Sequence, residues 1–314
     1  MNIMKTGLAL VTAVAILAII VFLLPAPAQS VVATGVTREY TITVEEKNIE
    51  YAPGLFLTAW VYNGSIPGPV IRANVGDIIK ITLVNKATLK HSIHVHGFEY
   101  NVTDDGAQMS PGSIVPPGGS YTYTFTATRP GFYPYHCHSN DRYPVSVHIQ
   151  QGLQGGIIVE DPANPLPPAK EYMIILDEAY TKPTQSVAHG CSYCAMGAKN
   201  FALNMRQFPL PQALNVKTGA IENPTARTGE LVRFYVLNLG NDIHTFHLHG
   251  HPLYKRSAAN WGTTQLVDGD NLGILTAETA VLETTARTPG NWLYHCHMDV
   301  HADLGMMGVF TVTP

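Results

Sequence analysis

The sequence has 314 residues, of which 46% are hydrophobic and 13% charged, and its formal net charge at pH 7 is -4. This length and composition allow two globular domains, each with a sizeable buried core. Acidic residues slightly outnumber basic ones, and no run of lysine and arginine could follow a phosphate backbone. Nucleic acid is therefore not an expected partner.

The first 30 residues differ in composition from the rest of the chain. Lys5 is their only charged residue, an apolar run covers residues 7–24, and the small residues Ala26, Pro27 and Ala28 follow. This order is typical of an export signal. The run is also just long enough to cross a bilayer as an uncleaved membrane tether. Both alternatives predict an exported protein that is extracellular, periplasmic or held at the outer face of the cell membrane.

Short stretches rich in valine, isoleucine, threonine and tyrosine predict β-strands in the rest of the chain. They include residues 40–44, 78–83, 121–127 and 231–237. Glycine and proline clusters separate them, and no long capped helical pattern occurs after residue 30. The predicted fold is all-β, with Greek-key β-sandwiches favoured over closed barrels.

An internal repeat predicts the number of domains. His91, His94 and His96 recur as His244, His247 and His249. The triplet His136-Cys137-His138 recurs as His295-Cys296-His297. We therefore predict two copies of one domain, at residues 31–160 and 170–314, joined by an extended proline-rich linker at residues 161–169.

The second copy has the spacing of a blue copper site. Alternate residues of a strand face the same side, so Cys296 and its two flanking histidines point to opposite sides. Cys296 is followed by His301 and Met306, and His244 supplies a second imidazole from upstream. One thiolate, two imidazoles and a weak axial thioether are the ligands that suit blue copper.

The first copy has a related but unequal set of ligands. It consists of His91, Cys137 and His148, with a longer loop between the cysteine and the second histidine. The residue five positions after His148 is Leu153, where the second copy has methionine. Because the axial thioether tunes the redox couple, we expect a higher potential at the first site.

Eight histidines remain for a separate cluster. They are His94, His96, His136, His138, His247, His249, His295 and His297. Closely spaced imidazoles suit several copper ions that reduce dioxygen. Zinc takes the same ligand types, but it does not explain two cysteines that each lie between histidines. Two other histidines, His189 and His251, are first interpreted as structural.

These motifs resemble those of the multicopper oxidases, and in particular the small two-domain laccases built from cupredoxin domains. The resemblance covers nearly the whole chain after residue 30. It is carried by residues 63–69, 94–97, 244–251 and 295–306. Two tandem cupredoxin-like Greek-key domains follow from it, and retention of Cys137 and His148 resembles the group with a type 1 copper site in both domains.

The resemblance also implies ligand roles. His94 and His247 would hold the type 2 copper, and the other six cluster histidines the type 3 pair. The trinuclear cluster would lie between domains of neighbouring chains, which implies a homotrimer. Asp105 matches an acidic residue that assists proton delivery, with a simple turn residue in Asp104-Asp105-Gly106 as the alternative.

The resulting functional prediction is a laccase-type oxidase with about five coppers per chain, of types 1, 2 and 3. A small reducing substrate would donate single electrons and dioxygen would accept four. A copper-containing nitrite reductase, a metal-ion oxidase and a non-catalytic copper electron carrier are the alternatives. Cys191 and Cys194 predict either a small-loop disulfide or an additional copper site with His189 or Met196.

Overall fold

The structure is a computed structural model that describes residues 35–180, 199–258 and 261–314. The apolar run at residues 7–24 and the cysteines Cys191 and Cys194 lie outside these residues. Among the described helices, none is long and apolar enough to cross a membrane.

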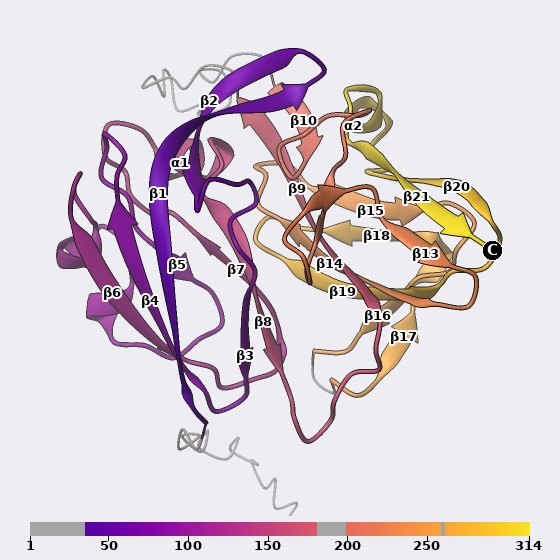
Figure 1. The fold of residues 1–314 in the computed structure, drawn as a ribbon, viewed down its shortest axis with the longest axis horizontal. Coiled ribbons are helices and arrows are strands. Elements are labelled where there is room, and N and C mark those ends of the chain that lie inside the picture. Colours follow the sequence, from indigo (N-terminus) through magenta and orange to yellow (C-terminus); the bar gives the residue numbers. More distant parts are fainter. Residues whose placement is uncertain (1–34, 181–198, 259–260) are drawn as a thin grey trace, which may run out of the picture. The chain divides into compact units, whose positions relative to one another are not determined.

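Domain 1, as we use the term, is the sandwich formed by strands β1 to β8. These strands are β1 (Thr37–Ala52), β2 (Leu55–Tyr62), β3 (Ile71–Asn74), β4 (Ile78–Asn85), β5 (His94–Val95), β6 (Ser120–Thr126), β7 (Gly131–His136) and β8 (Gln154–Glu160). One sheet has the order β2-β1-β4-β6 and the other β3-β8-β7-β5. Strands β1 and β4 pair in parallel, and β4 and β6 are antiparallel. Figure 1 shows this sandwich in indigo to magenta.

Domain 2 is the sandwich formed by the strands that follow. They are β9 (Lys170–Tyr180), β10 (Lys199–Leu203), β11 (Ala213–Asn215), β12 (Ile221–Glu222), β13 (Thr225–Arg227), β14 (Leu231–Asn238), β15 (His244–Leu248), β16 (Tyr254–Arg256), β17 (Thr264–Leu266), β18 (Asn271–Ile274), β19 (Thr279–Thr285), β20 (Gly290–His295) and β21 (Met307–Thr313). One sheet has the order β12-β11-β9-β14-β19-β16-β17, with β10 also paired to β9. The other has the order β13-β21-β20-β15-β18. The pairing of β9 with β14 is parallel, as between β1 and β4.

Helices are few and short in the described residues. The α-helices are α1 (Val145–Gln150) and α2 (Asp299–Asp303), and the 3-10 turns are η1 (Val102–Asp104), η2 (Pro111–Ser113) and η4 (Asp268–Asp270). The prediction of an all-β fold with two tandem sandwiches is therefore confirmed. Each of the two α-helices follows one of the two His-Cys-His triplets in the chain.

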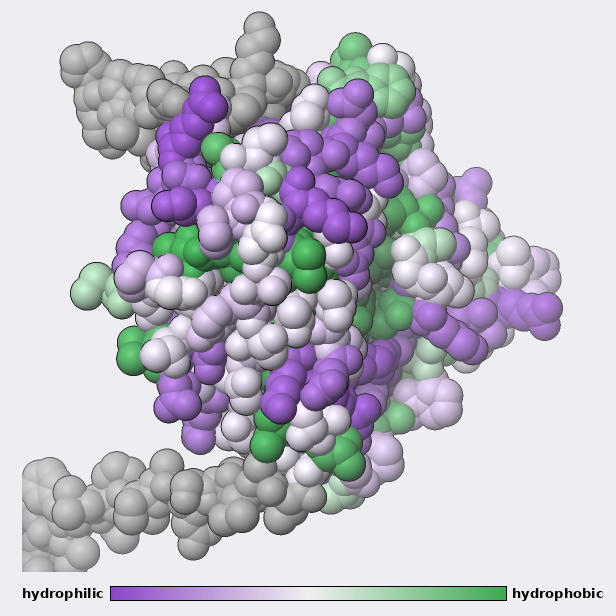
Figure 2. Space-filling view, turned by 60° about the vertical axis from the view of Figure 1, so that its left-hand side comes forward, coloured by the Kyte–Doolittle hydropathy of each residue, from purple (hydrophilic) through white to green (hydrophobic). Residues whose placement is uncertain are grey.

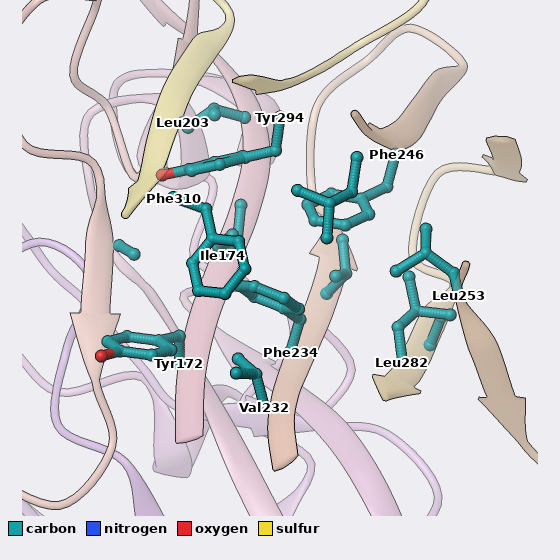
Figure 3. Close-up of a cluster of buried hydrophobic side chains, with 14 of the residues drawn as sticks. Tyr172, Ile174, Leu203, Val232, Phe234, Phe246, Leu253, Leu282, Tyr294 and Phe310 are labelled. Carbon is teal, nitrogen blue, oxygen red and sulfur yellow. The ribbon is translucent and has the colours of Figure 1, made fainter. Parts of the chain in front are cut away.

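The strand sequences explain how each core forms. In β4, Ile79, Ile81 and Leu83 alternate with more exposed residues and are fully buried between the sheets of domain 1. The core of domain 2 is built in the same way. Figure 3 shows Phe234 and Phe310 packed close to Ile174 in this core.

Two strands have continuous apolar runs because both of their faces are buried. In β8, Ile157 packs into the core of domain 1, whereas Ile158 packs against Met173 of β9. In β14, Phe234 faces the core of domain 2 and Tyr235 faces β7 and β8. Strands that lose solvent on both faces read as unbroken hydrophobic segments. The two domains therefore share a hydrophobic interface within the chain.

The exposed surface is mixed in character. Figure 2 shows hydrophilic and neutral residues interrupted by smaller hydrophobic areas. Exposed apolar side chains occur in both domains, and Met109 and Val300 are among the most exposed. Single exposed apolar residues are normal on a protein surface, so an exposed apolar residue has functional meaning only where it lies beside a candidate site.

Candidate metal centre

The structure brings the three predicted thiolate-site residues of domain 1 together in a buried pocket. Cys137 follows β7, His91 precedes β5 and His148 lies in α1. The Cys137 Sγ atom is 3.7 Å from His91 Nδ1 and 3.5 Å from His148 Nδ1, and the two Nδ1 atoms are 3.2 Å apart. The longer loop after Cys137 thus does not prevent the ligands from meeting.

Domain 2 repeats this geometry with the shorter loop. Cys296 follows β20, His244 begins β15 and His301 lies in α2. Cys296 Sγ is 3.8 Å from His244 Nδ1 and 3.6 Å from His301 Nδ1, and the Nδ1 atoms are 3.1 Å apart. In both domains one sulfur and two imidazole nitrogens converge on one point.

The donor sets fit copper. Cys137 and Cys296 are free thiols that are completely buried, and neither has a cysteine partner among the described residues. Each sulfur accepts a backbone N–H, from Ser92 in domain 1 and Thr245 in domain 2, at 3.4 Å. A thiolate with two imidazoles in a dry pocket is the ligand set of a blue copper site.

The axial positions of the two sites are equivalent in backbone geometry. The Cys296 N–H donates to the carbonyl of Met306 at 3.2 Å, and the Cys137 N–H donates to that of Leu153 at 3.0 Å. Both Met306 and Leu153 are fully buried in the same cores as the cysteines. Leu153 therefore occupies the position in domain 1 that Met306 occupies in domain 2.

Different groups surround the imidazoles in the two domains. In domain 1, Trp60 packs on His91 and His148, with ring centroids 5.2 and 4.9 Å apart, and Nε2 of His91 is buried without a hydrogen-bond partner in the described structure. In domain 2, Phe201 stacks on His301 at 3.8 Å, and Nε2 of His244 is 3.3 Å from Oε1 of the buried Glu178.

These surroundings change the acid–base behaviour of the ligands. Burial, with His148 nearby, lowers the pKa of His91 to about 3, and burial raises the pKa of the Cys137 thiol to about 11. Burial also opposes charge on His244, but its contacts with Cys296 and Glu178 outweigh burial and raise its pKa to about 9. For Cys296, hydrogen bonds from His244 and backbone amides outweigh the effect of burial and lower the pKa. The contacts of His244 and Cys296 therefore favour the charged forms of both groups, whereas burial disfavours charge on His91 and Cys137.

The remaining histidines form one cluster in each domain. In domain 1 the ligand atoms of His94, His96 and His136 all lie within 4.8 Å of one another, and the His138 ring is 4.9 Å from that of His94. In domain 2 the corresponding residues are His247, His249 and His295. The ring centroid of His297 is 5.1 Å from that of His247. Nε2 atoms of the second and third histidine are 3.1 Å apart in both clusters.

Backbone carbonyls fix the direction of these rings. His94 and His247 face His136 and His295 across antiparallel strand pairs. The Nδ1 atom of His136 donates to the carbonyl of Cys137 at 3.0 Å, and that of His295 to Cys296 at 2.8 Å. With Nδ1 committed in this way, Nε2 is free to bind a metal. The thiolate residue therefore helps to orient a cluster imidazole of the same domain.

Asp105, the predicted acidic residue, lies beside His94. Its carbonyl accepts a hydrogen bond from His94 Nδ1 at 2.8 Å, and its Oδ1 is 3.3 Å from the same nitrogen. Tyr100 donates its hydroxyl to Oδ1 at 3.0 Å, and burial together with this bond raises the pKa of Tyr100 to about 12. Asp105 thus contacts the cluster through His94 rather than acting only as a turn residue.

The sequence reasoning missed two acidic residues at the sites. Asp270 is the counterpart of Asp105, because its carbonyl and Oδ1 lie 2.9 and 3.2 Å from His247 Nδ1. Asp270 has no motif in common with Asp105, but its backbone φ of 56° is unusual for a residue other than glycine. Glu178, the partner of His244, follows the apolar run of β9 directly after Asp177, and both side chains are fully buried. A buried carboxylate needs a partner and is therefore a candidate functional residue.

Two histidines were interpreted as structural. His251 is buried, with Nδ1 donating to the carbonyl of His249 at 2.9 Å and Nε2 accepting the N–H of Arg287 at 3.2 Å. Both of its nitrogens are therefore used by the backbone. His189 and the neighbouring Cys191, Cys194 and Met196 lie outside the described residues, so their predicted disulfide or additional metal site stays a prediction.

Two family models, both described as multicopper oxidase, match residues 29–164 and 196–314. The chain belongs to the multicopper oxidase family. A solved multicopper oxidase structure is 30% identical, with a TM-score of 0.73, and the match covers 88% of this chain and 89% of that chain. The family membership predicted from the motifs is thus confirmed.

Copper nitrite reductases are also similar to this multicopper oxidase chain. The structure of the enzyme from Nitrosomonas europaea is 28% identical with a TM-score of 0.74, over 88% of this chain and 94% of that one. A probable nitrite reductase-hydroxylamine oxidoreductase fusion protein of Kuenenia stuttgartiensis is 32% identical over 89% of this chain. This chain spans 32% of the length of that fusion protein and about half of the curated copper-containing nitrite reductases.

The buried cluster histidines of this multicopper oxidase should make the copper-free protein less stable at low pH. Burial is the main cause that lowers the pKa of His136 to about 3 and that of His96 to about 4. The unfolded value is about 6.5, so the unfolded chain binds more protons as the pH falls. Their contribution to stability is complete above pH 6.5 and is lost as the pH falls through the folded values.

We therefore expect the protein prepared without copper to be less stable at pH 4.5 than at pH 7 by at least about 2 kcal/mol, since a difference of one in pKa between the folded and unfolded chain corresponds to about 1.4 kcal/mol. Urea unfolding at the two pH values measures this difference. The raised pKa of His244 has the opposite effect, because its contribution to stability is lost as the pH rises. That loss takes place between pH 6.5 and about 9, largely above the two pH values at which unfolding is measured. Equal stability at pH 4.5 and pH 7 would show that the histidines are not held neutral by burial.

Proposed function

We propose that this multicopper oxidase couples one-electron oxidation of a small reducing substrate to the four-electron reduction of dioxygen to water. The observation that carries the proposal is the set of eight cluster histidines in two matching groups beside the two thiolate pockets. In each group three ligand atoms lie within 4.8 Å of one another, and the ring of the fourth histidine packs on that of the first. Bound copper would supply one-electron transfer at the thiolate sites and dioxygen reduction at the cluster.

The chain connects each thiolate pocket to a cluster half through adjacent residues. Cys296 lies between His295 and His297, so a continuous covalent path leads from its sulfur to two cluster imidazoles. The His295 ring also donates to the carbonyl of Cys296. Cys137 has the same relation to His136 and His138. We expect type 1 sites at both cysteines, with His94 and His247 at the type 2 copper and the other six at the type 3 pair.

A homotrimer would complete the cluster. The described structure forms two separate histidine groups, one in each domain, and neither group alone has all eight ligands. The His297 side chain is 47% exposed, and the apolar residues Met298 and Val300 beside it are also exposed. On domain 1, Met109 is exposed in the loop that also carries Asp105. Apolar surface around incomplete ligand sets supports contact between domain 1 of one chain and domain 2 of the next.

Asp105 would hold and deliver protons at the cluster. Dioxygen reduction consumes protons, and Oδ1 of Asp105 lies between the Tyr100 hydroxyl and the His94 imidazole. A carboxylate in this position accepts a proton from one side and orients His94 from the other. The reducing substrate remains open among phenols, aromatic amines, metal ions and small nitrogen compounds. The residues 1–30 support an exported protein, either cleaved or tethered to a membrane.

Nitrite reduction is the second candidate, and similarity to copper nitrite reductases favours it. A single type 2 ion needs few histidines, so such an enzyme does not account for both complete groups. An electron carrier would need the thiolate sites alone and leaves all eight cluster histidines without a role.

Copper content with paired activity assays tests the proposal. We expect about five coppers per chain, strong absorption from the thiolate sites and dioxygen uptake in the presence of a phenol or an aromatic amine. Four coppers per chain would mean that the domain 1 thiolate site does not load. Two coppers per chain, with nitrite reduction and no dioxygen uptake, would exclude the oxidase.

A further inference from the structure

The two thiolate pockets have equivalent cysteines and histidines. Among the described residues, however, a carboxylate contacts the first histidine of the pocket only in domain 2. In domain 2, Glu178 Oε1 lies 3.3 Å from His244 Nε2, the nitrogen opposite the one that faces Cys296. Both side chains are fully buried. The corresponding nitrogen of His91 has no hydrogen-bond partner in the part of domain 1 that the structure describes.

Strand register shows which residue of domain 1 corresponds to Glu178. Leu176 of β9 pairs with Asn238 of β14, and Val44 of β1 pairs with Asn85 of β4. Glu178 is two residues beyond Leu176, so its counterpart is Glu46, two residues beyond Val44. The aromatic residues confirm this equivalence, since Phe201 pairs with Glu178 and Trp60 pairs with Glu46.

Both glutamates cap the loop before the first histidine of their site, but only Glu178 also reaches the ring. Glu178 accepts the backbone N–H of Asn241 at 2.9 Å, and Glu46 accepts that of Thr88 at 2.8 Å. The same carboxylate oxygen of Glu46 also accepts the Thr88 hydroxyl at 2.7 Å, in a more exposed position. The carboxylate is thus present in both copies and directed at the imidazole in one.

The two loops differ in sequence throughout, and one of these differences lies directly beside the ring. Asn85 and Asn238 accept the N–H of Ala87 and Gly240 at 2.9 Å, so these two residues are equivalent. A Cβ atom on Gly240 would lie 2.7 Å from His244 Nε2 and 2.9 Å from Glu178 Oε1. Glycine at position 240 therefore leaves the space in which the carboxylate meets the ring, whereas the equivalent position 87 carries alanine.

The backbone of Glu178 is also fixed from the other domain. Its N–H donates to Oε1 of Gln150 at 3.2 Å, while Nε2 of Gln150 donates to the carbonyl of Leu239 at 2.8 Å. Gln150 is fully buried and ends α1, the helix that carries His148 of the domain 1 pocket. The carboxylate is therefore held in place by the interface between the two domains.

We propose that Glu178 is a positioning residue that orients His244 and lowers the reduction potential of the copper in domain 2, so that the two thiolate sites of one chain differ in potential by design. A negative charge next to a ligand imidazole favours the more positive, oxidised metal and makes the ligand more basic. Leu153 in place of a thioether acts in the same direction by raising the potential in domain 1. The proposal rests on the proposed copper loading of both thiolate pockets.

Replacement of Glu178 tests the proposal when each pocket is observed alone. In a Cys137→Ser background only the domain 2 thiolate site absorbs, and redox titration of that band gives its potential. Glu178→Gln keeps the size of the side chain and removes its charge. We expect the potential to rise and the affinity for copper to fall by roughly tenfold, as is usual when the partner of a metal-bound histidine is lost.

Glu46→Gln in a Cys296→Ser background is the matched control, because it changes the equivalent residue of the other copy. The potential of the domain 1 site should not move. Gly240→Ala provides a second route, since its methyl group separates the carboxylate from the ring without altering any charge, and it should raise the domain 2 potential as Glu178→Gln does.

The outcomes separate the two proposals. If the unmodified protein shows no thiolate–copper absorption, the proposed function fails and the Glu178 proposal fails with it. If the absorption is present but Glu178→Gln and Gly240→Ala both leave the domain 2 potential unchanged, only the role of Glu178 is overturned. An equal shift in Glu46→Gln would also overturn it. If Glu178→Gln does not fold, the domain 2 potential of Gly240→Ala alone tests the role of Glu178.

Discussion

Cys296→Ser is expected to remove the absorption of the domain 2 thiolate site and to reduce dioxygen uptake roughly a hundredfold or more. Loss of a partner of a ligand already costs ten- to a hundredfold in metalloproteins, and here the ligand itself is lost. Cys296 Sγ faces both His244 and His301 in a buried pocket, so no other described side chain replaces it there. The sulfur that would link a metal in that pocket to the backbone between His295 and His297 is lost as well.

Cys137→Ser is the matched variant, and the comparison shows where electrons enter. Both cysteines are buried and have almost the same distances to their histidines. If domain 2 is the entry point, Cys137→Ser should keep most of the dioxygen uptake and lose only the absorption of its own site. Steady-state oxygen consumption and optical spectra measure both effects. Persistent uptake in Cys296→Ser with loss in Cys137→Ser would assign entry to domain 1.

Loss of one histidine from either cluster half is expected to abolish dioxygen reduction, and mixing the two defective chains should restore part of it. His94→Ala damages the half in domain 1, and His247→Ala damages the half in domain 2. In a ring of identical chains, each contact joins domain 1 of one chain to domain 2 of the next. Random mixing therefore leaves about a quarter of the contacts with two intact halves.

Co-expression of the two variants with different affinity tags gives the mixed assembly. Every mixed trimer, whichever variant is in excess, has one intact contact among its three. We therefore expect roughly a third of the normal dioxygen uptake in doubly purified protein, and none in either variant alone. The absorption of the thiolate sites should persist in all three preparations, because His94 and His247 are not ligands of those pockets. No recovery in verified mixed assemblies would show that each cluster is completed within one chain, and the trimer proposal would fail.

The sequence alone predicted the candidate ligands and a fold of two related sandwiches. The spacing of His91, His94 and His96, repeated from His244 onward, predicted two related domains, and the structure contains two sandwiches with the same pairing of β1 with β4 and β9 with β14. This was possible because a strand places alternate residues on opposite sides, a local rule that does not depend on distant parts of the chain. The same rule separates Cys137 from its flanking histidines.

The tertiary structure decided which acidic residues meet those ligands. Asp270 reaches His247 from the turn η4, and Glu178 reaches His244 across 66 positions of sequence. Glu46 occupies the same register as Glu178 and does not reach its histidine. Whether a carboxylate meets a ring depends on the packing of loops such as the one with Gly240, which no strand pattern encodes.

The two His-Cys-His triplets can therefore be recognised in the sequence, because their residues are adjacent in the chain. The difference between Leu153 and Met306 is visible in the sequence, whereas the carboxylate that reaches only one of the two pockets arises from contacts between strands and between domains. Gln150 of domain 1 anchors Glu178 of domain 2, and this contact exists only after the two sandwiches have packed together. The kind of metal site was predicted from composition and spacing, whereas the contact of Glu178 with His244 depends on side chains that folding brings together from distant segments.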